Sequence, residues 1–283
     1  IYGGYNNNLM NKTILSQIIK RVQQKLPREQ LAAFSVFVEQ FYNDEVWSDF
    51  AERSAEDLLG SVLAHWQLLY QRQAKQSKLK VYNPTLDKDG WECTHTVVLL
   101  AHEDMPFLVD SLQVALNRLG CPIHHLVHLG GIKIERDQKG FVTKVLPIQS
   151  FDDKAFVEAP IYIEIDKQFS AKELSRIATE LEAVLKDVGD AVNDYSLMQQ
   201  KVLAACKELE ETREKTSIAK KNIKLWQESE QFLRWLTEDH FVFLGYRSYK
   251  IANDCGDDAL EFVSGSSLGF LRNKDVKKIC RYF

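Results

Sequence analysis

Apolar positions in the first quarter of the chain recur at helical spacing. Intervals of three and four residues form successive stripes between residues 12 and 76, separated by Pro27 and by Asn43-Asp44. This spacing places the apolar side chains on one face of an amphipathic helix. The pattern predicts a small N-terminal helical unit whose apolar faces include Ile14, Ile18, Val22, Leu26, Leu31, Phe34, Phe37, Phe41, Leu58, Leu59, Val62, Trp66 and Leu69.

The spacing changes to that of strands at Thr94. Every residue from Val97 to Ala101 is apolar, the run ends before Asp104, and a helical pattern follows up to Gly120. We therefore predict a strand, a sharp turn and a helix. Asp104 is expected to cap the helix, Pro106 to lie in its first turn, and Gly120 to end it.

Further strands and a second helix follow. The strand segments are Pro122 to Glu135, Gly140 to Ile148 after a hairpin turn, and Pro160 to Asp166. The last segment alternates isoleucine with polar residues, which predicts a strand that buries one face only. Ser170 to Glu173 has the form of a capping box before another helix. This order predicts an α+β domain of the ferredoxin-like βαββαβ type, with two helices on one face of an antiparallel sheet.

The last third of the chain reads as long helices that lead into a further β-containing domain. Gly189-Asp190 is expected to interrupt the first helix, and Phe241 to Arg247 to form a strand whose hairpin partner is Ala259 to Val263. The stretch 75–84 reads as a solvated exit and a bend. The predicted organisation is a tail (1–11), the N-terminal helical unit (12–80), the α+β domain (81–190), a helical connector (191–238) and the start of another domain (239–283).

The predicted strand from Thr96 to Ala101 is apolar on both faces. The helices of a ferredoxin-like domain cover only one face of the sheet, so a second layer must cover the other. Three covers are open: the N-terminal helices, a second copy of the sheet, or another domain of a longer chain. An apolar face without such a cover would mark an interface.

Composition excludes several classes of function. The formal net charge is −4 and lysine and arginine are not densely clustered, which excludes the electrostatic footprint of a nucleic-acid-binding protein. No apolar run approaches the ~20 residues of a membrane helix, and residues 1–9 do not resemble a signal peptide, so we expect a cytoplasmic protein without membrane contact. The five cysteines contain no C-x-x-C pair, which argues against a disulfide framework or a zinc site.

No pattern of catalytic or cofactor-binding residues emerges. Five histidines fall within one predicted domain (His95, His102, His124, His125 and His128), but none has the spacing of metal ligands. Gly130-Gly131 is followed by no helix, and Ser264 to Gly269 matches neither a phosphate-binding loop nor a dinucleotide fingerprint. We predict no catalytic residue, no metal and no cofactor in this chain.

Three separated motifs carry a family resemblance. They are Asp104 to Ser111, preceded by Val81-Tyr82-Asn83-Pro84; Trp235-Leu236 with Phe241 to Arg247; and Gly265 to Arg272. Together they resemble the N-terminal region of the large bacterial NAD-specific glutamate dehydrogenases. The resemblance implies a non-catalytic, ACT-like first domain with regulatory or oligomerisation functions. NAD would bind only in the parent enzyme, and the partners would be downstream domains, other copies of the parent and an amino-acid effector. The final strand of the ACT pattern has no counterpart, because the second helix runs into more helix.

The turn after the first strand is the candidate site, as an effector-binding or interface turn. A helix N-terminus can bind a carboxylate through its free amides. Ligand-binding ACT domains usually carry Pro-Gly at this turn, whereas here Pro106 is followed by Phe107, so we expect a closed pocket and packing or interface residues. The candidate residues are Asp104, Met105, Pro106, Phe107, Leu108 and Val109. Two alternatives remain open: a stand-alone amino-acid-sensing ACT module and a helical scaffold or assembly module.

Overall fold

The computed structural model describes residues 14–42, 50, 53–128, 130–147, 150, 155–215, 220–254, 257–272 and 279–281. The chain divides into two compact units, Ile1–Leu185 and Lys186–Phe283.

Unit 1 is built on one antiparallel sheet. Its neighbouring strands run in the order β1-β2-β6-β4-β5, and β3 also pairs with β6. The hairpin of β4 and β5 turns at Asp137, whose carboxylate accepts the amides of Lys139 and Phe141 at 2.9 Å, as predicted. The strands are β1 (Lys78–Tyr82), β2 (Thr96–Glu103), β3 (Ile123–His128), β4 (Ile132–Arg136), β5 (Val142–Leu146) and β6 (Phe156–Ile165).

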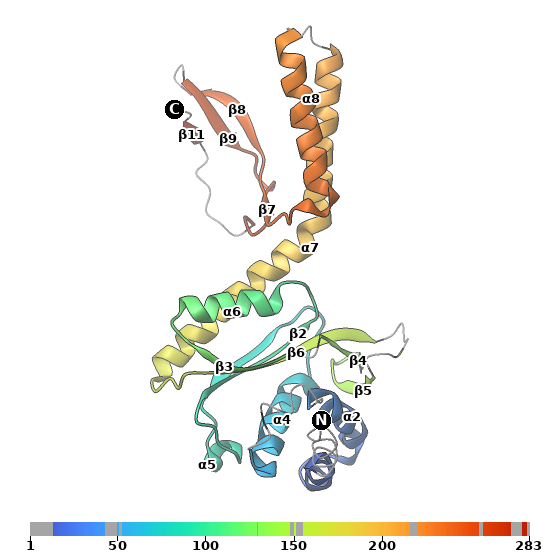
Figure 1. The fold of residues 1–283 in the computed structure, drawn as a ribbon, viewed down its shortest axis with the longest axis vertical. Coiled ribbons are helices and arrows are strands. Elements are labelled where there is room, and N and C mark those ends of the chain that lie inside the picture. Colours follow the sequence, from blue (N-terminus) through green and yellow to red (C-terminus); the bar gives the residue numbers. More distant parts are fainter. Residues whose placement is uncertain are drawn as a thin grey trace, which may run out of the picture. The chain divides into compact units, whose positions relative to one another are not determined.

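Helices cover both faces of this sheet (Figure 1). Helix α6 (Leu108–Arg118) and the start of α7 (Ala171–Lys215) lie on one face, and α2 (Arg28–Phe41) and α4 (Ala55–Tyr70) lie on the other. Val97, Leu99 and Ala101 of β2 join the core of α2 and α4, so the N-terminal helices provide the second cover. The sequence-based expectation of a doubly buried β2 is confirmed, since every side chain from Thr96 to His102 is buried.

Strand β1 differs from its predicted form. The stretch expected to be a solvated exit and a bend instead pairs along its whole length with β2, from Lys78 opposite Ala101 to Tyr82 opposite Val97. Strand β1 fills the sheet edge beside β2. In a βαββαβ fold the last strand takes this place. The mixed α/β architecture is therefore consistent with an ACT-like domain.

Strand β6 buries both faces, so the prediction of one buried face is wrong. Its alternating polar residues are buried as well: Glu158 and Glu164 are 0% exposed and Tyr162 is 1% exposed. The N-terminal helical layer encloses these polar side chains, and each must find a partner there because an unpaired buried charge is costly.

Helix α7 is continuous from Ala171 to Lys215, so the predicted break at Gly189-Asp190 is wrong. A single glycine costs a helix only about 1 kcal/mol relative to alanine, which a long helix can absorb. Ser170 caps its start by accepting the amide of Glu173 at 3.1 Å, as the capping box predicted.

Unit 2 contains the rest of α7, a second helix and short strands. The predicted strand from Phe241 to Arg247 is reduced to Gly245–Tyr246, which pairs with Leu268–Gly269. The predicted partner, around Ala259, pairs instead with the strand from Tyr249 to Asp254. The elements are α8 (Lys220–Trp235), the π-helix η1 (Leu236–His240), β7 (Gly245–Tyr246), β8 (Tyr249–Asp254), β9 (Asp257–Phe262), β10 (Leu268–Gly269) and β11 (Ile279–Arg281).

The two C-terminal motifs that carry the family resemblance, Phe241 to Arg247 and Gly265 to Arg272, are joined by hydrogen bonds within unit 2. Arg247 donates to the Ser267 hydroxyl at 3.0 Å and to the Leu271 carbonyl at 2.7 Å. Asp194 of α7 accepts the amide of Gly269 at 2.7 Å and a bidentate pair from Arg272. These motif residues therefore anchor the local fold of unit 2.

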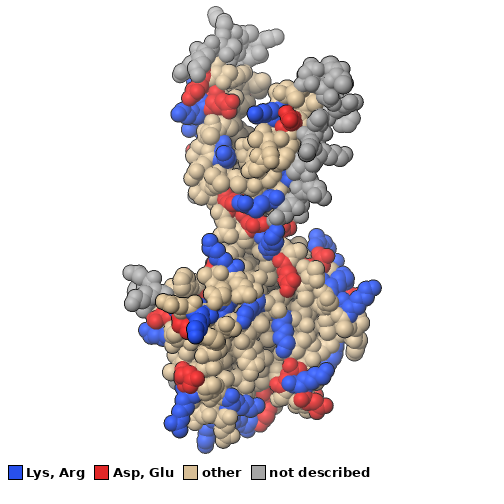
Figure 2. All heavy atoms as spheres, turned by 180° about the vertical axis from the view of Figure 1, so that it is seen from behind, with Lys and Arg blue, Asp and Glu red and all other residues tan. Residues whose placement is uncertain are grey.

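The surface carries charges of both signs. On the face seen in Figure 2, lysine and arginine are interspersed with aspartate and glutamate over the described residues. Within the part of the chain that the structure describes, no helix is both long and apolar enough to cross a membrane.

Candidate functional site

The turn between β2 and α6 is held by its backbone. Phe107 adopts the left-handed conformation (φ 70°, ψ 3°) immediately before the helix, and its side chain makes no capping hydrogen bond. The prediction that Asp104 caps α6 is therefore wrong, because the helix begins three residues too late for that side chain to reach its first amides. A non-glycine residue in this conformation costs roughly 1–2 kcal/mol.

The six candidate residues separate into buried and exposed groups. Leu108 is 2% exposed and packs in the core, Met105 and Val109 are half-buried, and Asp104, Pro106 and Phe107 are exposed. The amide of Asp104 donates to the Val157 carbonyl at 3.0 Å, which ties the turn to the start of β6. Phe107 and Val157 expose 46% and 42% of their surfaces, so the turn presents apolar side chains to solvent.

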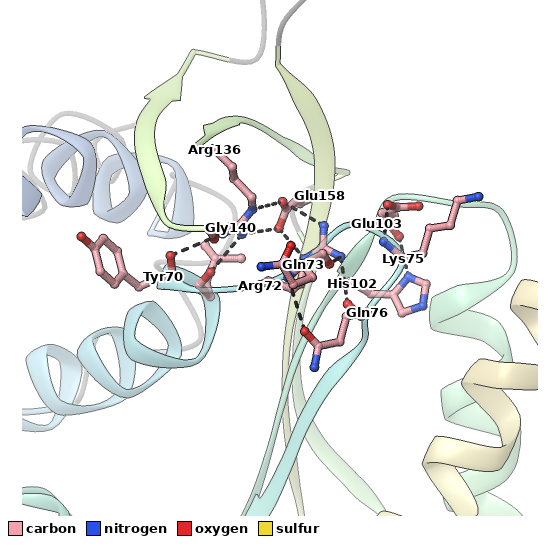
Figure 3. Close-up of polar contacts among 11 residues, drawn as sticks. Tyr70, Arg72, Gln73, Lys75, Gln76, His102, Glu103, Arg136, Gly140 and Glu158 are labelled. Carbon is pink, nitrogen blue, oxygen red and sulfur yellow. Dashed lines mark hydrogen bonds and ion pairs between the residues drawn. The ribbon is translucent and has the colours of Figure 1, made fainter. Parts of the chain in front are cut away.

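A polar site lies at the C-terminal end of α4, around the carboxylate of Glu158 (Figure 3). Arg72 approaches it through Nε at 3.0 Å and Nη2 at 2.9 Å. Arg136 approaches it through Nε at 2.6 Å and Nη2 at 2.8 Å. Two guanidinium groups therefore fork onto one carboxylate, and the exposed fractions of the two arginine side chains are 2% and 6%.

The two arginines carry one more positive charge than Glu158 neutralises, and backbone carbonyls accept their remaining N–H groups. Arg136 also donates to the carbonyls of Leu69 and Gly140 at 2.9 and 2.7 Å, and Arg72 donates to that of Gln76 at 2.9 Å. Leu69 lies in the last turn of α4, where the helix dipole favours a cation. Burial acts to raise the pKa of Glu158, but the bonds and charges of the two arginines outweigh it and hold that pKa below its usual value.

A second polar site surrounds Glu164 of β6. Arg53 forks onto both carboxylate oxygens at 2.7 Å, the Tyr162 hydroxyl donates to one of them, and His95 Nδ1 lies 2.9 Å from the other. Burial alone would raise the pKa of Glu164, but the hydrogen bonds from Arg53 and Tyr162 and the Arg53 charge lower it to about 2. The carboxylate is thus ionised and fully occupied.

The Glu164 site also brings together the only described trio that could hold a metal ion. Ligand atoms of Cys93, His95 and Glu164 lie within 4.8 Å of one another. Arg53 occupies both oxygens of Glu164 and places a positive charge where a cation would bind, and burial raises the pKa of the Cys93 thiol, which disfavours the thiolate ligand. The residues present therefore do not fit a bound metal.

The histidines singled out in the sequence are only partly gathered. His95 stacks on His124 with ring centroids 4.2 Å apart, and His124 pairs with Asp166 at 2.6 Å. His125 packs near the ring of Phe50, whereas His102 bonds the backbone carbonyl of Glu103 at 2.8 Å. Their contacts are local pairs and rings, with no shared ligand geometry among them.

One further histidine, His65 of α4, is fully buried among aromatic rings. Its Nε2 lies 3.0 Å from the Leu100 carbonyl, and its ring faces Phe37 and Phe41. Burial disfavours the protonated form and lowers the pKa to about 4, although the bond to Leu100 acts in the opposite direction.

We expect His65 to destabilise the fold in acid. The unfolded chain takes up this proton near pH 6.5 and the folded chain only near pH 4, so stability falls as the pH drops between these values. The loss should reach about 3 kcal/mol. Urea unfolding from pH 7.5 to 4.5 should show a shallower pH dependence for His65→Phe than for the wild type, and equal slopes would contradict the assignment.

Sequence reasoning missed the two buried carboxylate sites. Arg72 and Arg53 lie 86 and 111 residues from their glutamate partners, within the predicted N-terminal helical unit. The one available signal was the alternation of charged residues along β6, which reads equally well as a solvated face.

The chain is similar to one known protein family and to several named proteins. The family described as "Glutamate dehydrogenase, ACT1 domain" matches residues 37–181. A protein named NAD-specific glutamate dehydrogenase from Halomonas elongata is 36% identical over 259 residues, which cover 92% of this chain and 16% of that protein. One of the same name from Pseudomonas aeruginosa is 32% identical and covers 90% of this chain and 15% of its own length. The chain thus spans about a sixth of these relatives.

Proposed function

The chain belongs to the family of glutamate dehydrogenase ACT1 domains, and from this membership we propose that it is the N-terminal, non-catalytic region of a large NAD-specific glutamate dehydrogenase. The parent enzyme would convert L-glutamate, NAD⁺ and water into 2-oxoglutarate, ammonium and NADH, with release of a proton. The observation that carries the proposal is the ACT1 match together with similarity over nine-tenths of the chain to two proteins of that name.

The role proposed for this region is assembly or allosteric control in a cytoplasmic enzyme. Its contributions would be an N-terminal helical unit (12–80), the ACT-like domain (81–190), a helical connector (191–238) and the start of a further domain (239–283). NAD would bind in the downstream part of the parent, which agrees with the lack of a dinucleotide fingerprint in the sequence. Downstream domains and further copies of the parent would be its partners.

We assign the turn at Asp104–Val109 to contacts with such partners rather than to an effector. Phe107 keeps the left-handed backbone that a glycine would adopt, but it adds a side chain at the position where a ligand would approach the helix amides. The buried Leu108 fixes the turn to the core while Phe107 stays 46% exposed, an arrangement that supports an apolar contact surface.

Calorimetric titration with the common amino acids tests this assignment. We expect the wild-type chain to bind none of them, because Phe107 closes the approach to the amides of α6. Phe107→Gly should gain binding, since glycine keeps the backbone and removes the obstruction. Phe169→Gly is the control, because Phe169 is 90% exposed and lies outside the turn. Binding by the wild type would favour a stand-alone amino-acid sensor instead.

A further inference from the structure

The hairpin of β8 and β9 in unit 2 has one apolar face. Its register places Tyr249 opposite Phe262 and Ile251 opposite Leu260. Because residues directly opposite each other in an antiparallel pair share a face, and successive side chains alternate, these four side chains stand on the same side of the sheet. The rings of Tyr249 and Phe262 meet edge to face, with their centroids 6.1 Å apart. These four residues form what we call the apolar β8–β9 face.

The apolar β8–β9 face is open to solvent, whereas the opposite face of the hairpin contains a packed residue. Ile251 exposes 82% of its surface and Tyr249 exposes 37%, and Leu260 and Phe262 are only half-buried. On the opposite face Ala259 is 0% exposed. The described residues therefore bury a small side chain of this hairpin and leave its large apolar side chains in contact with water.

An apolar sheet face of this kind needs a second layer. Sheets in folded domains bury their apolar face against helices or another sheet. Strands β8, β9 and β11 form a sheet of only three strands, which is close to the lower limit of independent stability, so burial of its apolar face matters. The exposure of Ile251 shows that the described part of unit 2 does not supply that layer.

Two covers fit the apolar β8–β9 face: a segment of the same polypeptide or a second copy of it. Four side chains are few beside the roughly 20–30 residues that each partner contributes to a stable complex, so a second copy would bind weakly. A covalently linked segment has an effective concentration on the order of mM and can cover a small face permanently. This chain covers only 16% and 15% of two relatives, so the proposed parent is long enough to supply such a segment.

We propose that the apolar β8–β9 face is one half of a packed layer, and that a downstream segment of the same polypeptide completes it. The inference rests on the proposed function in one respect, because it takes the longer parent as the source of the segment. The covering segment is amphipathic: its apolar side chains pack on Ile251 and Tyr249, and its polar face remains in water. Lys250, whose side chain lies on the opposite face of β8, stays accessible.

Thiol labelling with a maleimide tests this cover. Ile251→Cys is compared in the 283-residue chain and in the proposed full-length enzyme, and mass spectrometry of the labelled peptide separates position 251 from the native cysteines. We expect rapid labelling in the 283-residue chain and labelling at least about tenfold slower in the full-length enzyme, since a covered thiol reacts only when the structure opens locally. Equal rates in the two proteins would overturn the proposal, and so would slow labelling in the 283-residue chain.

Lys250→Cys is the matched control. Lys250 is an exposed residue of the same strand on the opposite face, so its replacement should be labelled at the same rate in both proteins. Protection of both positions would contradict a cover that is specific to the apolar face. Protection of position 251 that disappears on dilution would assign the face to a second copy and overturn the intramolecular cover.

Hydroxyl-radical footprinting of the unsubstituted proteins provides a readout without any variant. Tyr249 should be oxidised more slowly in the full-length enzyme than in the 283-residue chain, and unchanged oxidation would contradict the cover. Glutamate-dependent formation of NADH by the same full-length preparation reports on the proposed function separately. Its absence together with protection at position 251 would reject the enzymatic assignment and leave the cover standing.

Discussion

Glu158→Gln is expected to lower the free energy of unfolding by about 3 kcal/mol or more. The substitution keeps the shape of the side chain but removes the negative charge that Arg72 and Arg136 share, and their side chains are 2% and 6% exposed. Two buried guanidinium groups would then repel each other without a counter-charge. Urea unfolding at pH 7.5 measures the effect.

The control for this prediction is Glu180→Gln. Glu180 pairs with Arg118 at 3.4 Å on the surface, where the side chains are 45% and 69% exposed. Exposed ion pairs contribute about 0–1 kcal/mol, so this variant should unfold almost as the wild type does. Similar losses of stability in the two variants would show that the Glu158 carboxylate does not compensate the two buried arginine charges as its geometry indicates.

The second large effect is expected for Gly60→Ala. A Cβ at this position would lie 2.2 Å from Trp91 Cβ and 2.3 Å from Trp91 Cγ. Trp91 is 1% exposed and the clash involves the root of its side chain, so α4 or the Trp91 backbone must shift. Overpacking of this kind costs about 3 kcal/mol, more than the ~1 kcal/mol that alanine gains in helix propensity.

Gly189→Ala provides the matched comparison for this prediction, because both glycines lie inside helices. Gly189 has open space around it, so alanine should stabilise the chain by about 1 kcal/mol there. The midpoints of thermal unfolding should therefore shift in opposite directions. A stabilised Gly60→Ala variant would show that α4 and Trp91 are not in close contact.

Local signals in the sequence predicted the local structure well. Ser170 caps α7 by accepting the Glu173 amide at 3.1 Å, as its capping box predicted. Gly120 ends α6 with φ 72°, its amide donating to Asn117 and that of Cys121 to Leu116. Caps and stops depend on side chains within four residues, which a sequence displays directly.

Long-range packing explains where sequence reasoning fell short. A glycine in a helix reads the same at Gly60 and at Gly189, although only Gly60 faces a tryptophan. Glu164 lies in the alternating part of the last predicted strand and reads as part of a solvated face, because its partner Arg53 lies 111 residues away. Strand β1 was likewise hidden, since its lysines suggest solvent whereas its backbone pairs with β2.

The turn between β2 and α6 lies where the sequence predicted it, but its backbone geometry was only partly predicted. The position equivalent to glycine in ligand-binding ACT domains does adopt the backbone conformation that glycine favours, with φ 70° at Phe107. The cap assigned to Asp104 was wrong because the sequence does not reveal that the turn keeps this residue outside the helix. Its amide bonds β6 instead.

The most direct test of the proposed function is glutamate-dependent reduction of NAD⁺, followed by NADH absorbance. We predict no turnover by the 283-residue chain alone and clear turnover by the proposed full-length enzyme. Turnover by this chain alone, or none by the longer protein with glutamate and NAD⁺, would contradict the account.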